Sequence, residues 1–295
     1  MLCPLNRVLV TDGKLLYNCS EFKELRGNDI KTELPEIAVV GVIGEQKEII
    51  IPTKFCGKKV KLIHNLNVYR KGSMFSEIKG DFALIPSTAR QDINFYYPCE
   101  RLVPEPEYLV NTDKTTAEKV SFDGIAFEKS VFHANKKIKT ITFGTGKVSS
   151  ESFMNCEALG TVELTERVRV IGKKAFSGCS SLEFVVLPSK LRKIGSDAFA
   201  FTGLRYIAIP SAVEAIMPNT FKNCKKLEMI FIPPTVKSIS ISAFDGVDSD
   251  MTIIGISGSA AEVYAKKYKF RFVEYDDSLR EKMKLVSSLY NSVKK

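Results

Sequence analysis

The chain of 295 residues is 44% hydrophobic and 26% charged, a composition typical of globular proteins with a sizeable core. Its 43 basic and 34 acidic residues give a net charge of +9. The lysines are spread along the chain, which favours a solvated surface over the alternative of an acidic partner such as nucleic acid, an anionic glycan or lipid headgroups. No apolar run is long enough to predict a transmembrane helix.

The first 46 residues are expected to form a β-rich segment. The sequence LLYNCSEF at 15–22 places Leu16, Cys19 and Phe22 at offsets that recur further along the chain. This segment is therefore interpreted as a degenerate repeat or a cap. The N-terminal run lacks the continuous apolar core of a signal peptide. The chain is then either cytoplasmic or one whose export signal has been removed.

Residues 47–119 are expected to hold degenerate repeats with an irregular insertion. The stretch 48–63 predicts a strand, a Pro and a second strand, and Tyr96, Cys99 and Leu102 repeat the downstream offsets. Phe75 stands eleven residues before Pro86, the same separation as between a Phe and a Pro further along the chain. The segment 103–119, VPEPEYLVNTDKTTAEK, interrupts the pattern and predicts an irregular insertion or a linker.

Residues 120–256 carry an internal repeat with a phenylalanine in each unit. The spacings between successive anchors are 23, 23, 22 and 23 residues. The anchors are Phe153, Phe176, Phe199, Phe221 and Phe244. Such a constant period predicts that the units stack, because one unit cannot bury both its strand face and its Phe alone.

Each unit follows one order of elements. An apolar strand ends in Pro, as at Pro188 and Pro210, which suits a strand terminus because Pro cannot donate to a strand ladder. A second apolar stretch follows and ends in Ile-Gly, as at Ile171-Gly172 and Ile194-Gly195, where Gly permits a tight turn. A short helical turn around the anchor Phe then leads to the Leu that opens the next strand.

The seven cysteines form no CxxC pair, which argues against a structural zinc site and a disulfide framework. Cys156, Cys179 and Cys224 each stand three residues after an anchor Phe, and Asn135 has the same position after Phe132. This spacing predicts free, buried cysteines that pack as small apolar groups and react slowly with thiol reagents.

Residues 257–295 are expected to form a C-terminal cap and an amphipathic helix. Ser259 and Glu262 have the spacing of a capping box, which predicts a helix start there. The tail then places apolar residues at spacings of four and three, typical of one helix face: Leu279, Met283, Val286, Tyr290 and Val293. Docking of this helix onto the repeats is favoured over pairing between chains.

The IGxxAFxxCxxL pattern, with strands that end in Ile-Pro or Leu-Pro, resembles the BspA-type leucine-rich repeats over residues 120–275. The resemblance implies a β-rich, curved leucine-rich-repeat solenoid with a parallel strand ladder. It also implies adhesion or protein binding, a cell-surface or secreted location, and no catalytic residues. The chain departs from the pattern at Met217 and Ser240, which stand where Gly is expected.

No enzyme motif is present. His64 and His133 are interpreted as structural or surface residues, and Gly144-Thr145-Gly146-Lys147 lacks the upstream Gly and the following Ser or Thr of a phosphate loop. We therefore expect no catalytic, cofactor-binding or metal-ligating residue and no cofactor.

Alternation along the strands predicts an open face. With Leu182, Val185 and Leu187 in the core, this face is polar in the first units, at Thr140, Thr142, Thr161 and Glu163, and then aromatic. The candidate partner-binding residues of the aromatic part are Phe184, Val186, Tyr206, Met229 and Phe231. Phe184, Tyr206 and Phe231, from three successive units, are expected to form one compact patch. Burial within the chain is the alternative, because a slip of one residue exchanges the two faces.

The sequence therefore predicts a non-catalytic repeat module that binds a macromolecule, most readily a protein, with a glycan or a host surface as the alternative ligand. An intracellular scaffold or a self-associating structural protein is the competing function. No nucleic acid and no membrane span are expected.

Overall fold

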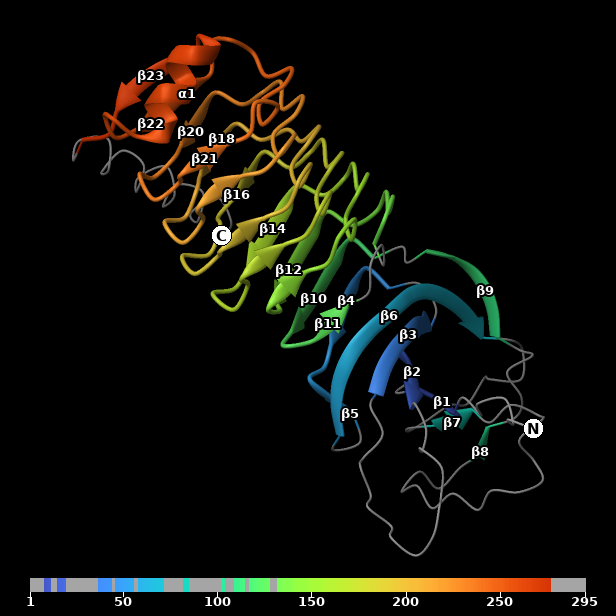
Figure 1. Cartoon of the computed structure of the whole chain (residues 1–295). Coiled ribbons are helices and arrows are strands. Elements are labelled where there is room, and N and C mark those ends of the chain that lie inside the picture. Colours follow the sequence, from blue (N-terminus) through green and yellow to red (C-terminus); the bar gives the residue numbers. More distant parts are fainter. Residues whose placement is uncertain are drawn as a thin grey trace, which may run out of the picture. The chain divides into compact units, whose positions relative to one another are not determined.

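The computed structural model describes residues 8–11, 15–19, 37–43, 46–55, 58–71, 82–84, 102–103, 109–114, 117–127 and 132–276 (Figure 1). The chain divides into two units, residues 1–132 and residues 133–295. The expected repeat elements at Phe75, Pro86, Tyr96 and Cys99, and the predicted tail helix, lie outside the described residues.

The first unit holds a mixed sheet with the strand order β11-β6-β3-β2-β1-β7-β8. β1 and β2 pair antiparallel, as do β2 and β3, whereas β3 pairs parallel with the long strand β6. The antiparallel pairing of β2, at residues 15–19, differs from the parallel ladder that a stacked repeat would form. The bounds are β1 (Val8–Thr11), β2 (Leu15–Cys19), β3 (Ile37–Ile43), β5 (Lys54–Phe55), β6 (Lys58–Lys71), β7 (Phe82–Leu84), β8 (Leu102–Val103), β9 (Leu109–Lys114) and β11 (Ala126–Phe127).

Two further observations concern the segment between residues 47 and 123. β4 (Glu48–Ile51) pairs parallel with β10 (Lys119–Asp123), with Glu48 opposite Lys119. Residues 109–114, expected to be irregular, instead form β9, which pairs antiparallel with β6. The expectation is wrong there because the ladder with β6 satisfies backbone groups that a sequence pattern alone leaves unassigned.

In the second unit the first strand of every repeat pairs parallel with the next, so one continuous sheet runs through the repeats. Apolar residues alternate into the core, as Val162, Val185, Ile207 and Ile230 show. This is the predicted parallel solenoid. Its strands are β12 (Thr140–Gly144), β14 (Thr161–Leu164), β16 (Phe184–Val185), β18 (Tyr206–Ala208), β20 (Met229–Phe231), β22 (Thr252–Gly255) and β23 (Arg271–Glu274).

A second set of short strands follows the first in each repeat. The prolines at the strand ends start the connecting turns: the carbonyls of Pro188, Pro210 and Pro233 each accept a hydrogen bond from the amide three residues later, at 3.0 Å. The short strands also pair parallel with one another. They are β13 (Lys147–Val148), β15 (Val170–Ile171), β17 (Lys193–Ile194), β19 (Ala215–Ile216) and β21 (Ser238–Ile239).

The anchor phenylalanines stack in a ladder through the middle of the repeats. Neighbouring ring centroids lie 5.3 to 5.9 Å apart, and the rings from Phe153 to Phe244 are within 10° of parallel. These anchors are almost completely buried. The turns around them are closed by backbone bonds between residues three apart, such as Cys179 N to Phe176 O at 3.2 Å. The predicted core anchors are confirmed.

The glycine of each Ile-Gly pair lies where there is no room for a side chain. A Cβ on Gly172 would lie 2.6 Å from the amide nitrogen of Ser150, and a Cβ on Gly195 would lie 2.6 Å from that of Lys173. Each turn therefore presses directly on the turn of the preceding repeat. A side chain at either glycine would push these backbones apart.

The cysteines after the anchors are free and buried, as predicted. The Cys179 thiol lies 3.1 Å from the carbonyl oxygen of Phe153, and the Cys224 thiol lies 3.0 Å from that of Phe199. Burial raises the pKa of Cys179 well above its usual value and that of Cys224 to about 11. Asn135 uses the same position differently, because its side-chain oxygen accepts bonds from the amides of Lys137 and Ile138.

The predicted helix at the end of the repeats is α1 (Ala260–Tyr268), and Ser259 is its N-cap. The expected capping-box bonds are not formed: the Ser259 side chain makes no cap bond, and Glu262 accepts from the amide of Gly258 instead, at 2.7 Å. Tyr264 from α1 and Phe270 meet Phe244 edge-on, at interplanar angles of 62° and 67°. The phenylalanine ladder ends against them.

Candidate functional site

In the second unit, the strand register aligns the side chains of the open face in rows that run across neighbouring strands. Thr140 lies opposite Thr161, Thr161 opposite Phe184, Phe184 opposite Tyr206, and Tyr206 opposite Met229. Neighbouring strands lie about 4.8 Å apart, so these side chains stand next to one another. We call Phe184, Tyr206 and Met229 the aromatic row.

The side chains of the aromatic row are half-buried rather than fully exposed. The rings of Phe184 and Tyr206 stack, with 5.8 Å between centroids and 21° between planes. The Arg205 guanidinium lies 5.9 Å from the centroid of the Tyr206 ring. The row therefore presents apolar surface held in place by its neighbours.

A charged network fixes the polar edge of the aromatic row. The Tyr206 hydroxyl and the Arg205 guanidinium both donate to the carboxylate of Glu228. These bonds, with that of Tyr206 first, hold the pKa of Glu228 below its usual value, while the bond to Glu228 and burial raise the pKa of Tyr206. The tyrosine ring is thus fixed at its hydroxyl end as well as by stacking.

The remaining candidates lie on a second row. Val186 is 50% exposed, the most open of the five candidate residues. Phe231 lies opposite Ala208 instead of Tyr206, and its ring contacts Tyr275 with 4.8 Å between centroids. Phe184 and Tyr206 thus form the expected patch, but Met229, not Phe231, continues it.

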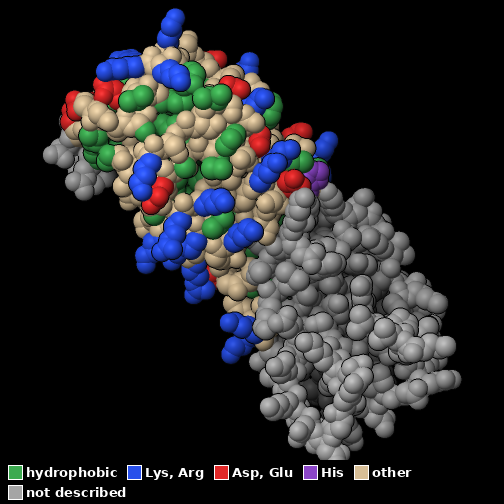
Figure 2. Space-filling view, in the orientation of Figure 1, with side chains coloured by type: hydrophobic (Ala, Val, Ile, Leu, Met, Phe, Trp, Pro, Cys, Tyr) green, Lys and Arg blue, Asp and Glu red, His purple; other side chains and the backbone are tan. Residues whose placement is uncertain are grey.

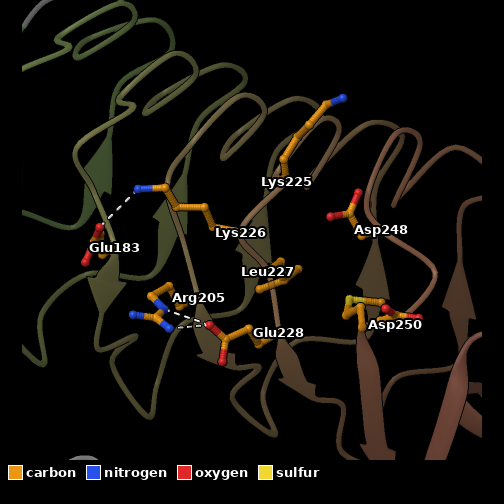
Figure 3. A pocket seen from close by; sticks show the side chains of 9 residues that line it. Glu183, Arg205, Lys225, Lys226, Leu227, Glu228, Asp248 and Asp250 are labelled. Atoms are coloured by element: carbon orange, nitrogen blue, oxygen red, sulfur yellow. Dashed lines mark hydrogen bonds and ion pairs between the residues drawn. The ribbon is translucent and has the colours of Figure 1, made fainter.

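An open groove lies beside the aromatic row, at the N-terminal ends of β16, β18 and β20 (Figure 3). Its volume is about 430 Å³. Two ion pairs cross it, Lys226 to Glu183 at 3.2 Å and Arg205 to Glu228 (Figure 3). Asp248 and Asp250 line the other side, and Leu227 and Met251 add apolar surface (Figure 3). The groove therefore offers both charges and apolar contact next to the aromatic side chains.

Three residues of this region were missed from sequence alone. Arg205 and Glu228 stand 23 residues apart and look like ordinary surface charges until the parallel register brings them together. Tyr275 comes from the segment after β23 and contacts Phe231 from there. The repeat period could have signalled the first pair, since it places equivalent positions side by side.

Within the described residues, no group of three or more His, Cys, Asp or Glu side chains is arranged to hold a metal ion. His133, which sequence analysis assigned a structural role, is partly buried. No helix among these residues is both long and apolar enough to span a membrane.

Comparison with known proteins identifies the repeats. Residues 146–270 match the family model of the BspA type leucine rich repeat region, in six copies. No curated protein matches the chain.

Several solved structures resemble the chain. A leucine-rich repeat protein from Bacteroides ovatus is 20% identical, with 78% of this chain and 54% of that chain covered and a TM-score of 0.38. This chain therefore spans about half of that protein. The leucine rich repeat protein of T. pallidum is 15% identical, with 83% and 94% covered and a TM-score of 0.37. A leucine rich cell surface protein from Faecalibacterium prausnitzii is 15% identical, with 84% and 76% covered and a TM-score of 0.27.

The stacked anchors, the parallel ladder and the six matched copies agree with one another. Residues 146–270 of this chain therefore match the BspA-type leucine-rich repeats in both sequence and fold.

Proposed function

We propose that this chain is a non-catalytic, adhesion-type module that binds a protein partner on the open strand face, over the aromatic row. The observation that carries the proposal is the register of Phe184, Tyr206 and Met229, which gathers three large apolar side chains on neighbouring strands at a solvent face. Aromatic residues, Met and Arg are enriched in interface cores, and all three kinds occur here. Leucine-rich repeats also commonly mediate protein interaction.

The contrast along the face supports this location. The same row begins with Thr140 and Thr161, which offer small polar side chains, and becomes apolar only at Phe184. A partner that buried Phe184, Tyr206 and Met229 would remove apolar area from water, which is the main favourable term in most associations. We therefore place the centre of the interface over β16, β18 and β20.

The groove beside the row gives the partner a second contact. Arg205 and Glu228 hold each other and Tyr206 in place before any partner arrives, which lowers the ordering cost of binding. The exposed Asp248 and Asp250 across the groove favour a partner segment with a basic side chain at that edge. Such rim charges affect the association rate more than the lifetime of the complex.

The test compares two triple variants. The first replaces Phe184, Tyr206 and Met229 by Ser. The second, a matched control, replaces Thr140, Thr161 and Thr252 by Ala in the same row. Each variant and the unchanged chain are used in pull-downs from cells of the source organism and its surroundings, with identification of the retained proteins. A photo-crosslinking residue at the exposed Val186 then marks proteins bound over the face.

The proposal expects one or more proteins that are retained by the unchanged chain and the Thr control, lost with the aromatic-row variant, and crosslinked through Val186. Sedimentation equilibrium of the same three proteins tests the alternative of a self-associating structural protein. A dimer that disappears only in the aromatic-row variant would establish self-association in place of a foreign partner. Equal capture by all three proteins would overturn the proposed face.

A further inference from the structure

A second surface of the repeats is strongly basic. It consists of the short strands β13, β15 and β17 with the turns that precede β15 and β17. We call it the basic strip, and its residues are Lys147, Arg167, Arg169, Lys190, Arg192 and Lys193. Figure 2 shows Lys and Arg side chains gathered along the lower margin of the described repeats, with few acidic side chains among them.

The parallel register aligns the basic strip along the direction in which the repeats stack. Lys147 lies opposite Val170, which lies opposite Lys193, so the two lysines are two strand spacings apart, about 10 Å. The amide of Arg192 bonds to the carbonyl of Arg169 at 2.8 Å, which places these two arginines on neighbouring strands. The core side of the same strands carries Val148, Ile171 and Ile194, so the lysines face solvent.

The segments of the basic strip hold little negative charge. Glu166 is the one acidic residue in the segments 144–149, 165–172 and 188–195. Its carboxylate accepts bonds from the Ser189 hydroxyl and amide, and these bonds, together with the nearby positive charges of Lys190 and Arg169, hold the pKa of Glu166 below its usual value. Among residues 132–276, no salt bridge involves Lys147, Arg192 or Lys193.

The next repeats do not continue this charge. Lys147, Val170 and Lys193 hold the same position in β13, β15 and β17. In the next two short strands, β19 and β21, this position is held by Ala215 and Ser238. The charges beside them, Glu214 and Lys237, form an ion pair at 3.3 Å. The basic strip is therefore a local feature of three repeats and not a general property of the turns.

We infer that the basic strip binds a linear sulfated polysaccharide. The strip places basic residues on three successive repeats at steps set by the strand ladder, and an extended polyanion can contact such a series at several points at once. The planar guanidinium of the exposed Arg192 can bind an oxyanion with two parallel hydrogen bonds, whereas that of Arg169 already donates to the carbonyls of Glu166 and Val168.

The other polyanions are less well matched. The segments 144–149, 165–172 and 188–195 contain no aromatic residue on which the bases of a single-stranded nucleic acid could stack. None of the strongly exposed large apolar side chains among the described residues lies in these segments, so the strip offers nothing to insert into a lipid surface. The surface recognises charge arranged along a line, which is what a sulfated polysaccharide presents.

This inference does not rest on the proposed function. The basic strip lies on the short strands that follow the Pro turns, whereas the aromatic row lies on β16, β18 and β20. A chain that lost either surface by substitution would keep the other. The two surfaces can therefore be tested separately.

The experiment measures binding of the full chain to immobilised heparin at several salt concentrations. The strip variant replaces Lys147, Arg192 and Lys193 by Gln, all exposed and without an ion pair in the described structure. The matched control replaces Lys136, Lys137 and Lys225 by Gln; these exposed lysines precede the first strands of their repeats, and the net charge changes by the same amount. Chemically desulfated heparin and a short DNA duplex serve as further probes, and unchanged thermal unfolding confirms that each variant is folded.

We expect the strip variant to bind heparin roughly tenfold or more weakly, with a shallower dependence on salt, while the control loses less than about twofold. Desulfated heparin and the DNA duplex should bind the unchanged chain more weakly than heparin. Equal losses in the two variants would show that only net charge matters and would overturn the site. Binding of desulfated heparin or of DNA as tight as that of heparin would overturn the assignment to a sulfated polysaccharide. None of these heparin-binding results depends on whether a protein partner binds at the aromatic row.

Discussion

The phenylalanine ladder inside the repeats and the aromatic row on their open face are built from the same period, yet they differ in what they tolerate. Inside, five successive anchors from Phe153 to Phe244 stack at 5.3 to 5.9 Å. Outside, one row runs through Thr, Thr, Phe, Tyr and Met. An internal ring contacts rings on both sides, so its shape is set by its neighbours, whereas a face residue has solvent on one side. The side chains of the face can therefore change while the scaffold stays the same.

The largest expected effect is the loss of stability in Phe176→Ala. The ring is fully buried between Phe153 and Phe199, so its removal leaves a cavity that the stacked repeats cannot close. We expect the free energy of unfolding to fall by about 3–5 kcal/mol. Equilibrium denaturation in urea measures this change. The control is Val186→Ala in the same repeat, where the side chain is exposed and the expected loss is below about 1 kcal/mol.

A smaller effect is expected at the thiols beside the ladder. Cys179 is buried against the Phe153 carbonyl, and burial raises the pKa of its thiol, so both access and ionisation are reduced. We expect labelling by a thiol reagent at neutral pH to be roughly a hundredfold slower in the native chain than in the urea-unfolded chain. Fast native labelling of Cys179, located by mass spectrometry, would contradict its role as a packing group.

The same thiols give a pH dependence with a defined sign. The pKa of Cys224 is about 11 in the folded chain, against a usual value near 9.0. A group whose pKa is raised by folding stabilises the folded chain fully below its usual pKa and loses that contribution as pH rises through the folded value. The difference in unfolding free energy between the unchanged chain and Cys224→Ala should therefore shrink between about pH 9 and pH 11. A constant difference would show that folding does not raise the pKa of this thiol.

The smallest effect is expected on the face. Tyr206→Phe keeps the stacked ring but removes the hydroxyl that donates to Glu228. Because the pair is at the surface, we expect the unfolding free energy to change by less than about 1 kcal/mol. That bond is the first cause of the lowered pKa of Glu228, so the pKa should rise in the variant. The stabilising contribution of this bond is fully present above the usual pKa of Glu228, near 4.5, and is lost as pH falls through the lowered pKa. An NMR titration of the Glu228 carboxylate in both proteins measures the change.

Much of the repeat region follows from the sequence. The Phe period identifies the ladder, Pro marks the end of the first strand in three repeats, and Ile-Gly marks the turn in two, because each of these residue types has one physical role at its position. The alternation Leu182, Val185, Leu187 also identifies the buried side of β16 correctly. These features recur from unit to unit, so the sequence alone is enough to reveal them.

The details of the site could not be obtained in the same way. The unit at Phe199 has one residue fewer before its next strand, at Leu204, than the unit at Phe176 has before Leu182. Which side chains then stand opposite one another depends on the three-dimensional register, and this places Met229 rather than Phe231 beside Tyr206. The contact of Tyr275 with Phe231 joins segments 44 residues apart in the sequence and depends on how the chain returns after α1.

The end of the ladder has a consequence for how such a chain can change in length. Rings from Phe153 to Phe244 lie flat on one another, but Tyr264 and Phe270 meet Phe244 with their edges. A further ring of the same kind has no flat surface to lie on beyond that point. Duplication of a unit upstream of β22 would insert another ring between two parallel neighbours and leave this terminus intact. Growth of the array by duplication is therefore favoured upstream of this end, and each added unit would extend the open face by whichever side chain it carries there.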